Sequence, residues 1–368
     1  MSTLLLFALA CAPAPTRRVA VPAPATEAAF VPAEARLEAG DPSDQRGASP
    51  HDGPTRLPTV VAESRGEGPI DMPPVVLRDG FALVSPNRLR VIGADGQERW
   101  SRQARLAGPP LVTEDGLAVA EEGGGVSLYS LGQGALKASF SGGAGGAEGG
   151  PVRLNDELAW ADRAGTVQGQ TGWSVALSDK TAGGLCSDGR RAYVSTVDGR
   201  LSALTHKGLE WQATVPGKPV GHPVTDGDRV VVAWQDRGGG GVSAFSAVDG
   251  ALRWTSPLVQ TPLTPPTLGE ALYVPVKGGE IVALDLSTGQ QRWTAAVGSA
   301  ITSRPTASRT GLYVGDLDGR LHRLDKDDGG LIWTLELSLP IEASPTLLPG
   351  ALLVGLADGR LLTLRETP

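Results

Sequence analysis

Few residues of this chain combine the types and spacing that chemistry requires. Asp-Gly-Arg occurs at 188–190, 198–200, 318–320 and 358–360, and arginines next to carboxylates could hold an anionic ligand. Asp-Gly is also a typical hairpin-turn pair, because glycine adopts the positive φ that a tight turn demands. Three of the four triplets fall at the same position of a repeat, so we interpret all four as turns.

The other reactive side chains do not form a recognisable catalytic motif. The four histidines are scattered along the chain, and nothing singles out a His/Asp/Ser set. Cys186 aligns with Val224 of the next repeat, which predicts a small buried side chain. Two cysteines without C-x-x-C spacing indicate neither a metal site nor a disulfide framework. We therefore expect no catalytic residue, no bound cofactor, no metal ligand and no small-molecule substrate.

Two glycine-rich runs, residues 142–150 and 238–241, lack the Lys-Ser/Thr pair and following helix of a phosphate-binding loop. We interpret both runs as loose loops between strands. If the protein has a partner surface, these loops and the irregular third repeat are the first places to look, because loops often carry function.

Cys11 is the residue whose surroundings predict a modification. The short apolar run at 4–10 ends in small residues before Cys11, as in bacterial lipoprotein signal peptides. We expect residues 1–10 to be removed and Cys11 to be acylated, which would anchor the chain to a membrane. The alternative is an apolar tail with an accidental cysteine. Ala12 follows Cys11, and by the rule known for enteric lipoproteins this favours the outer membrane, facing the periplasm or exposed at the cell surface.

The segment after Cys11 predicts a tether. Residues 11–55 are rich in Pro and Ala and offer little to bury, so they should remain disordered between the anchor and a folded domain at 56–368. The net charge of −7 gives no electrostatic reason to expect nucleic acid. No stretch approaches the roughly 20 apolar residues that span a bilayer.

The folded part is organised by a repeat of roughly 40 residues, clearest at 278–293, where a strand, a Thr-Gly turn and a second strand follow one another. The last apolar residue before the turn recurs in eight copies, at Val91, Tyr129, Gly169, Leu204, Phe245, Leu284, Leu324 and Leu364. A tryptophan follows in five of them: Trp100, Trp211, Trp254, Trp293 and Trp333. Glycines before the tryptophan, among them Gly250, Gly289 and Gly329, permit the turn.

Each copy contains four short strands, which predicts an all-β fold, an eight-bladed β-propeller. We expect the tryptophans to wedge against the neighbouring blade. The last copy lacks its outer strand, while residues 57–62 form a spare strand with no partner. This pattern predicts a ring closed by strands from both termini, which removes an exposed sheet edge.

The Ala-x-Asp-x-x-Thr-Gly-x-x-x-Trp pattern at 283–293 resembles the tryptophan-docking motif of quinoprotein-type (PQQ-like) propellers. One branch of that superfamily comprises dehydrogenases that bind a quinone and Ca²⁺ on the propeller axis, in longer chains and often with adjacent cysteines. The other branch, the BamB family of outer-membrane assembly lipoproteins, has eight such blades behind a lipidated cysteine.

The second branch fits this chain better in size, anchor and number of blades. The resemblance implies a non-catalytic, membrane-tethered scaffold that binds protein partners in the cell envelope, with a role in outer-membrane protein assembly. Two alternatives stay open: a quinone- and Ca²⁺-dependent dehydrogenase-like enzyme, and an adhesion or binding module unrelated to assembly.

Overall fold

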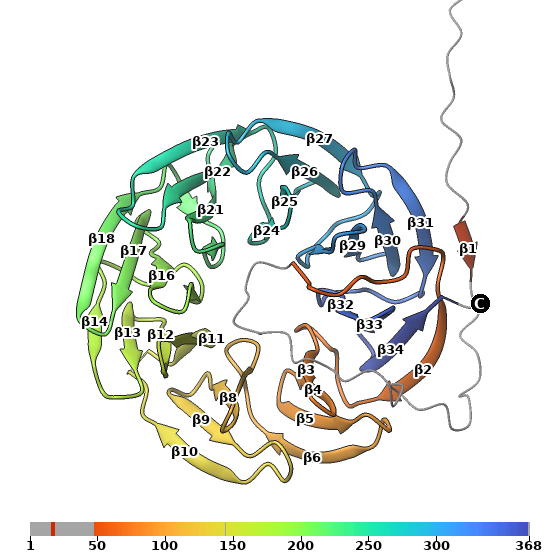
Figure 1. Cartoon of the computed structure of the whole chain (residues 1–368), viewed down its shortest axis with the longest axis horizontal. Helices are drawn as coiled ribbons and strands as arrows, with labels where there is room; N and C mark the ends of the chain where they lie inside the picture. Colours follow the sequence, from red (N-terminus) through yellow and green to blue (C-terminus); the bar gives the residue numbers. More distant parts are fainter. Residues whose placement is uncertain (1–15, 19–47, 144, 367–368) are drawn as a thin grey trace, which may run out of the picture.

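The computed structural model of the chain describes residues 16–18, 48–143 and 145–366, which form strands, turns and loops. Eight antiparallel sheets stand radially around a central axis, so the predicted eight-bladed propeller is confirmed (Figure 1). The described part contains no helix long and apolar enough to cross a membrane.

The first four blades each take four consecutive strands, ordered from the axis outward. Blade 1 contains β3 (Val75–Leu77), β4 (Gly80–Ser85), β5 (Arg88–Gly93) and β6 (Glu98–Gln103). Blade 2 contains β7 (Leu111–Thr113), β8 (Gly116–Ala120), β9 (Val126–Tyr129) and β10 (Leu136–Phe140). Blade 3 contains β11 (Ala147–Leu154), β12 (Glu157–Asp162), β13 (Thr166–Gly169) and β14 (Ser174–Ala176). Blade 4 contains β15 (Cys186–Ser187), β16 (Ala192–Ser195), β17 (Arg200–Thr205) and β18 (Gly208–Thr214).

The next three blades repeat this order with small additions. Blade 5 contains β19 (Lys218–Pro219) and β20 (Val224–Thr225), which both pair with β21 (Arg229–Asp236), then β22 (Gly239–Ser246) and β23 (Leu252–Leu258). Blade 6 contains β24 (Thr267–Leu268), β25 (Leu272–Val276), β26 (Glu280–Leu284) and β27 (Gln291–Ala296). Blade 7 contains β28 (Thr306–Ala307), β29 (Leu312–Gly315), β30 (Arg320–Leu324) and β31 (Leu331–Glu336).

Blade 8 closes the ring with strands from both ends of the chain. Its inner strands are β32 (Thr346–Leu348), β33 (Ala351–Gly355) and β34 (Arg360–Arg365). Its outer strand is β2 (Thr59–Arg65), which pairs antiparallel with β34 (Figure 1). The predicted closure by the spare N-terminal strand is therefore confirmed, and the edge of β34 is covered.

The hydrophobic core lies between the blades. The second strand of a blade is mostly buried, and β4 and β25 are buried along their whole length. The outer strand β6 is instead largely exposed, with Trp100 as its one buried residue. One cluster joins Val84 and Val91 of blade 1 to Leu117 and Val119 of blade 2. Because such layers form only between neighbours, a blade depends on both adjacent blades for its stability.

The folded part begins earlier than residue 56, where the sequence predicted its start. Ala48 bridges Ala307, and Ser49 N donates to the Ala307 carbonyl at 2.8 Å. The Tyr313 hydroxyl donates to the Pro54 carbonyl at 3.0 Å. Residues 48–55 were expected to be tether because they carry few apolar groups, but polar contacts to blade 7 hold them. In addition, β1 (Thr16–Arg18) pairs in parallel with β31.

Candidate functional site

Four of the five predicted docking tryptophans form a hydrogen bond to the next blade. In each case the indole Nε1 donates to a carbonyl in the turn before that blade's outer strand. The bonds are Trp100 to Leu131 at 2.7 Å, Trp211 to Ala247 at 3.1 Å, Trp254 to Leu286 at 3.0 Å and Trp293 to Lys326 at 3.1 Å.

The docked rings lie on glycines of the same turns. A Cβ atom on Gly289 would lie 2.5 Å from the Trp254 ring, and one on Gly329 would lie 2.6 Å from the Trp293 ring. Gly250 faces Trp211 in the same way at 2.5 Å. These glycines also have φ near +70°. Glycine is thus required twice, by the backbone conformation and by the space that the indole fills.

Blades 2 and 3 depart from this docking pattern. Phe140 of blade 2 packs against the fully buried Trp160 of blade 3, with ring centroids 6.3 Å apart. Trp173 of blade 3 turns back to its own blade, where its Nε1 donates to Glu157 Oε1 at 2.7 Å. The third repeat is therefore irregular in its contacts as well as in its sequence.

Trp333 faces the closing blade and has a different environment. Its ring is 3% exposed and belongs to an apolar cluster that includes Leu362 and Leu364. Its Nε1 has no hydrogen-bond partner among the described residues. No hairpin turn follows β34 to supply the carbonyl, because the outer strand of blade 8 comes from the other end of the chain.

A split turn replaces that missing hairpin. Glu366 accepts hydrogen bonds from the amides of Thr55 and, at 2.8 Å, of Arg56. These amides lower the pKa of Glu366. In the continuous turn of blade 6, Asp285 Oδ1 accepts the amides of Ser287 and Thr288 at 3.0 Å in the same manner. A carboxylate thus caps the turn in both cases, although at blade 8 the two halves come from opposite ends of the chain.

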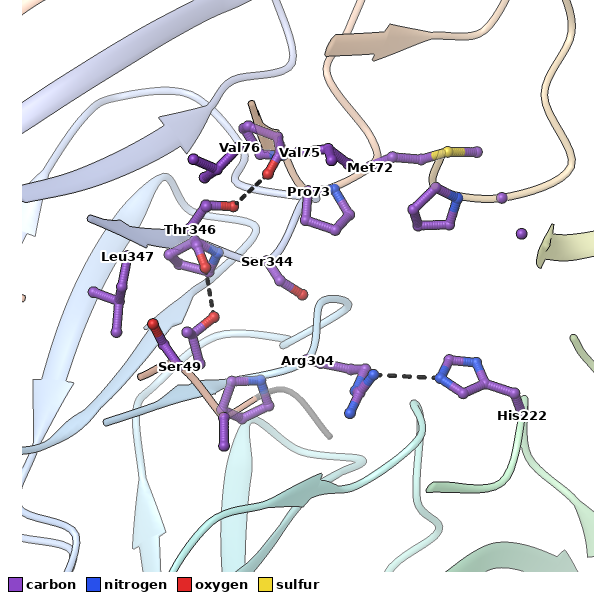
Figure 2. Close-up of a pocket in the computed structure, with 18 of the residues that line it drawn as sticks. Ser49, Met72, Pro73, Val75, Val76, His222, Arg304, Ser344, Thr346 and Leu347 are labelled. Atoms are coloured by element: carbon purple, nitrogen blue, oxygen red, sulfur yellow. Dashed lines mark hydrogen bonds between the residues drawn. The ribbon is translucent and has the colours of Figure 1, made fainter. Parts of the chain in front are cut away.

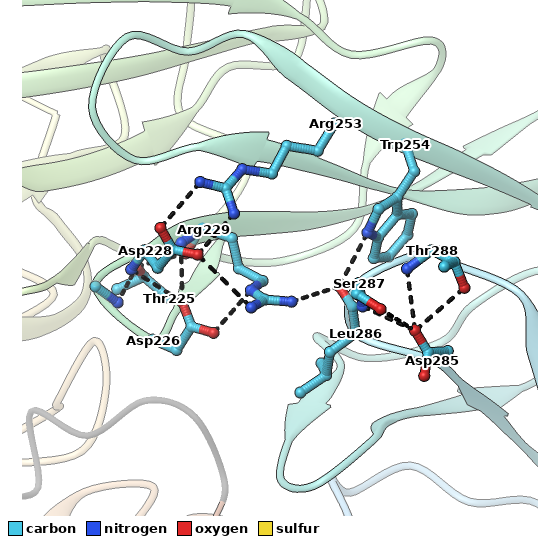
Figure 3. Close-up of polar contacts among 11 residues, drawn as sticks. Thr225, Asp226, Asp228, Arg229, Arg253, Trp254, Asp285, Leu286, Ser287 and Thr288 are labelled. Carbon is cyan, nitrogen blue, oxygen red and sulfur yellow. Dashed lines mark hydrogen bonds and ion pairs between the residues drawn. The ribbon is translucent and has the colours of Figure 1, made fainter.

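A polar network ties blade 5 to blade 6 (Figure 3). Arg229 forms an ion pair with Asp226 at 2.8 Å and donates to the Leu286 carbonyl, which also accepts from Trp254. Arg253 donates two hydrogen bonds of 2.6 and 2.9 Å to the carboxylate of Asp228, and this pairing lowers the pKa of that carboxyl group. Each charge has a partner of opposite sign, so the network acts as a structural joint.

The axis of the ring contains a cavity of about 980 Å³, lined by residues of all eight blades and by residues 48–51. Threonine hydroxyls connect successive inner strands around part of this wall. Thr267 donates to the Pro305 carbonyl at 2.6 Å, Thr306 to Pro345 at 2.5 Å and Thr346 to Pro74 at 3.0 Å. The wall is therefore fixed by the same hydrogen bonds that join blades 6, 7, 8 and 1.

Arg304 and His222 lie next to each other in the cavity wall (Figure 2). Arg304 Nη1 lies 3.3 Å from His222 Nε2, and Nη2 donates to the Pro266 carbonyl at 3.0 Å. His222 is partly buried in the cavity wall, and its desolvation, followed by the charge of Arg304, lowers its pKa to about 3. The imidazole is thus neutral at pH 7, whereas the guanidinium keeps its charge. Among the residues that the structure describes, no group of His, Cys, Asp and Glu could hold a metal ion.

Comparison with known proteins identifies the family. The family model described as "Outer membrane protein assembly factor BamB" matches residues 155–308 and 298–367, more than half of the chain. The chain belongs to this family.

Curated BamB relatives match over a shorter range. The outer membrane protein assembly factor BamB of Nitrosomonas eutropha is 31% identical over 160 residues, which cover 40% of this chain and 38% of the relative. BamB of Burkholderia pseudomallei is 29% identical over 161 residues, or 40% of this chain and 42% of the relative. The matches thus span about two fifths of each relative's length.

Two solved structures share the fold. The crystal structure of BamB from Moraxella catarrhalis superposes with a TM-score of 0.67 at 18% identity, covering 84% of this chain and all of that one. The computationally designed Ika8 protein reaches a TM-score of 0.71 at 14% identity over 82% of this chain and 98% of its own. A designed protein superposes as well as a BamB, so at these identities the likeness shows the fold alone.

The remaining sequence predictions have mixed outcomes in this BamB-family chain. The Asp-Gly-Arg triplets are turns as predicted, with positive φ at Gly189, Gly199, Gly319 and Gly359. Cys186 is 1% exposed, and burial raises the pKa of its thiol. Cys11 lies outside the described residues.

The interpretation of the glycine-rich runs as loose loops was wrong in part. Gly149 and Gly150 lie in β11, and Gly239, Gly240 and Gly241 lie in β22, where they pair with β21. Some of these glycines allow a close approach of neighbours. A Cβ on Gly241 would lie 2.4 Å from the Trp234 ring, and one on Gly150 would lie 2.3 Å from the Pro109 carbonyl oxygen.

Sequence reasoning missed two features. Gly134 was not assigned to docking, although a Cβ there would lie 2.5 Å from the Trp100 ring. The repeat that contains Gly134 carries Phe140 in place of the tryptophan, so its turn was not recognised as a docking turn. The pair of Arg304 and His222 was also missed, because these residues are far apart in sequence and meet only when the ring closes.

Proposed function

We propose that this chain is a non-catalytic scaffold that binds protein partners in the cell envelope and takes part in outer-membrane protein assembly. The observation that carries the proposal is the BamB family match over residues 155–308 and 298–367, on a ring of eight short blades. The curated relatives named for outer membrane protein assembly support it further.

We further propose that a lipid on Cys11 holds the scaffold on the outer membrane, with the segment between Cys11 and the ring as the connection to the membrane. The support is the apolar run before Cys11 and the small residues next to it. Growth with a clickable fatty acid should label the wild-type chain and leave Cys11→Ala unlabelled. Equal labelling of both chains would contradict the anchor.

Exposed apolar side chains favour one part of the rim as the partner surface. Leu209 of blade 4 is 49% exposed, and Val248 and Leu252 of blade 5 are 65% and 57% exposed. Trp211 docks on Gly250, which brings the strand of Leu209 to the turn that carries Val248. Gathered apolar side chains of this size mark protein interfaces more often than scattered ones do.

Affinity purification from solubilised membranes tests the proposal. The wild-type chain should recover outer-membrane assembly components, and Leu209→Lys with Val248→Lys should lose them. Leu136→Lys is the matched control, because Leu136 is 59% exposed on blade 2. Recovery of a different complex, or of the chain alone, would refute the assembly role and favour an adhesion module. Equal loss in the control would show that the chosen surface is wrong.

A further inference from the structure

The N-terminal part of the chain meets blade 7 at both of its edges. On the outer edge, β1 pairs in parallel with β31, and Thr16 lies opposite Thr334. On the inner edge, the Ser49 amide donates to the Ala307 carbonyl at 2.8 Å, next to the axis. Wherever the intervening segment runs, the N-terminal chain therefore enters and leaves at one blade.

The added strand distinguishes blade 7 from the other blades. Among the described strands, β31 is the outer strand that carries a further strand on its outer edge. Thr255, Thr294 and Thr334 directly follow the docking tryptophans of blades 5, 6 and 7. The first two are exposed, whereas Thr334, which pairs with β1, is 3% exposed. In blade 5, Pro257 stands where β31 has Glu336, and a proline offers no N–H group to an added strand.

The edge of β31 is also fixed from inside the blade. Thr334 Oγ1 lies 3.0 Å from His322 Nδ1, and His322 Nε2 lies 3.2 Å from Asp316 Oδ2. All three side chains are buried. A strand that adds to this edge meets a backbone that is already ordered, which lowers the entropic cost of pairing.

The place of β1 in the sequence limits how far the ring can lie from Cys11. Thr16 is five residues after Cys11, and an extended chain spans at most about 3.6 Å per residue, so the two are at most about 18 Å apart. Without the pairing, the connection would run from Cys11 to Ala48. A flexible coil of that length has an end-to-end distance of about 35 Å and could swing in any direction.

We propose that the outer edge of blade 7 faces the membrane, because β1 holds it next to the lipid on Cys11. This inference rests on the lipid anchor proposed above. Leu331 and Ile332 of β31 are 40% and 38% exposed, so this edge offers apolar side chains to the bilayer surface. The strand of Leu209, β18, lies across the ring from β31 (Figure 1). The rim surface proposed for the protein partner would then point away from the membrane.

Energy transfer from the ring to the bilayer tests this orientation. The full acylated chain is bound to phosphatidylcholine vesicles whose headgroups carry an acceptor dye. A donor dye is placed on one added cysteine: Ile332→Cys in blade 7, Leu136→Cys in blade 2 or Leu209→Cys in blade 4, all of them at exposed positions. Cys186 is buried and should not react with the dye. Transfer from position 332 should be severalfold more efficient than from positions 136 and 209.

Proline variants test whether β1 sets the orientation. Arg17→Pro removes an amide hydrogen from the middle of β1 and should bring the three transfer efficiencies close together. Leu37→Pro is the matched control, because it places a proline between Arg18 and Ala48 instead of in β1. It should keep the difference between the three positions.

The outcomes separate this inference from the lipid anchor. Equal transfer from the three positions, with the chain still on the vesicles, would overturn the orientation and leave the anchor standing. Release of the chain from the vesicles would overturn both. An unchanged pattern in Arg17→Pro would show that β1 does not hold the ring. If Ile332→Cys fails to fold, Leu331→Cys reports on the same edge.

Discussion

Replacing single docking tryptophans by phenylalanine should separate the hydrogen bond from the ring packing. Trp293 and Trp333 are both buried, at 8% and 3% exposure, and Trp→Phe removes similar ring volume from each. Trp293 also loses its bond to the Lys326 carbonyl, whereas Trp333 has no described partner to lose. The Tyr273 hydroxyl also donates to the Lys326 carbonyl at 3.3 Å, so this carbonyl keeps one hydrogen bond in Trp293→Phe.

The expected difference follows from the worth of one hydrogen bond. A typical hydrogen bond contributes about 1 kcal/mol to the free energy of unfolding, whereas an unsatisfied buried N–H lowers it by about 1–3 kcal/mol. Trp333→Phe removes such an unsatisfied N–H. Trp293→Phe should therefore lower the free energy of unfolding by about 1–3 kcal/mol more than Trp333→Phe does. Guanidinium titration followed by far-UV circular dichroism measures both variants without relying on indole fluorescence. Equal losses, or a larger loss for Trp333→Phe, would refute the docking account.

Three further predictions concern the turns, the cavity and the closure. Gly289→Ala should cost about 2–4 kcal/mol of unfolding free energy in denaturant titration, from backbone strain and the clash with the indole. Gly350→Ala has φ of 64° but no neighbour within 4 Å, so it should cost only about 1 kcal/mol; equal costs would contradict the clash. The lowered pKa of His222 means that the unfolded chain binds this proton more readily, so stability is lost as pH falls below about 6.5 toward 3. Between pH 8 and pH 5 the wild type should lose about 2 kcal/mol more than His222→Gln, and parallel pH profiles would contradict this. Glu366→Gln should accelerate hydrogen exchange at the two amides that it caps while blade 6 is unchanged, and unaltered exchange would show that the split turn does not close the ring.

The architecture could be predicted because it depends on local patterns that repeat. A hairpin with a Thr-Gly turn and a tryptophan, recurring about every 40 residues, leaves few folds other than a propeller. The closing strand could be predicted from an imbalance, since the last copy lacked an outer strand and residues 57–62 had no partner. Pairing of β2 with β34 confirmed this expectation.

The features that escaped prediction depend on contacts between distant segments. Residues 48–55 resemble the tether in composition, and they are held by polar contacts to blades 7 and 8, such as the Ser49 amide on Ala307, the Pro54 carbonyl on Tyr313 and the Thr55 amide on Glu366. The glycines of β22 read as a loop because nothing local shows that Trp234 fills the space above them. Arg304 and His222 could have been found by aligning the residue before each inner strand.

The outer-membrane proteome tests the proposed role of this BamB-family chain in outer-membrane protein assembly most directly. Depleting the chain in its own cell and quantifying outer-membrane proteins by mass spectrometry should show a broad decrease in integral outer-membrane proteins. The wild-type chain should restore them, Leu136→Lys should do so equally, and Leu209→Lys with Val248→Lys should not. Unchanged levels of these proteins after depletion would contradict the assembly role.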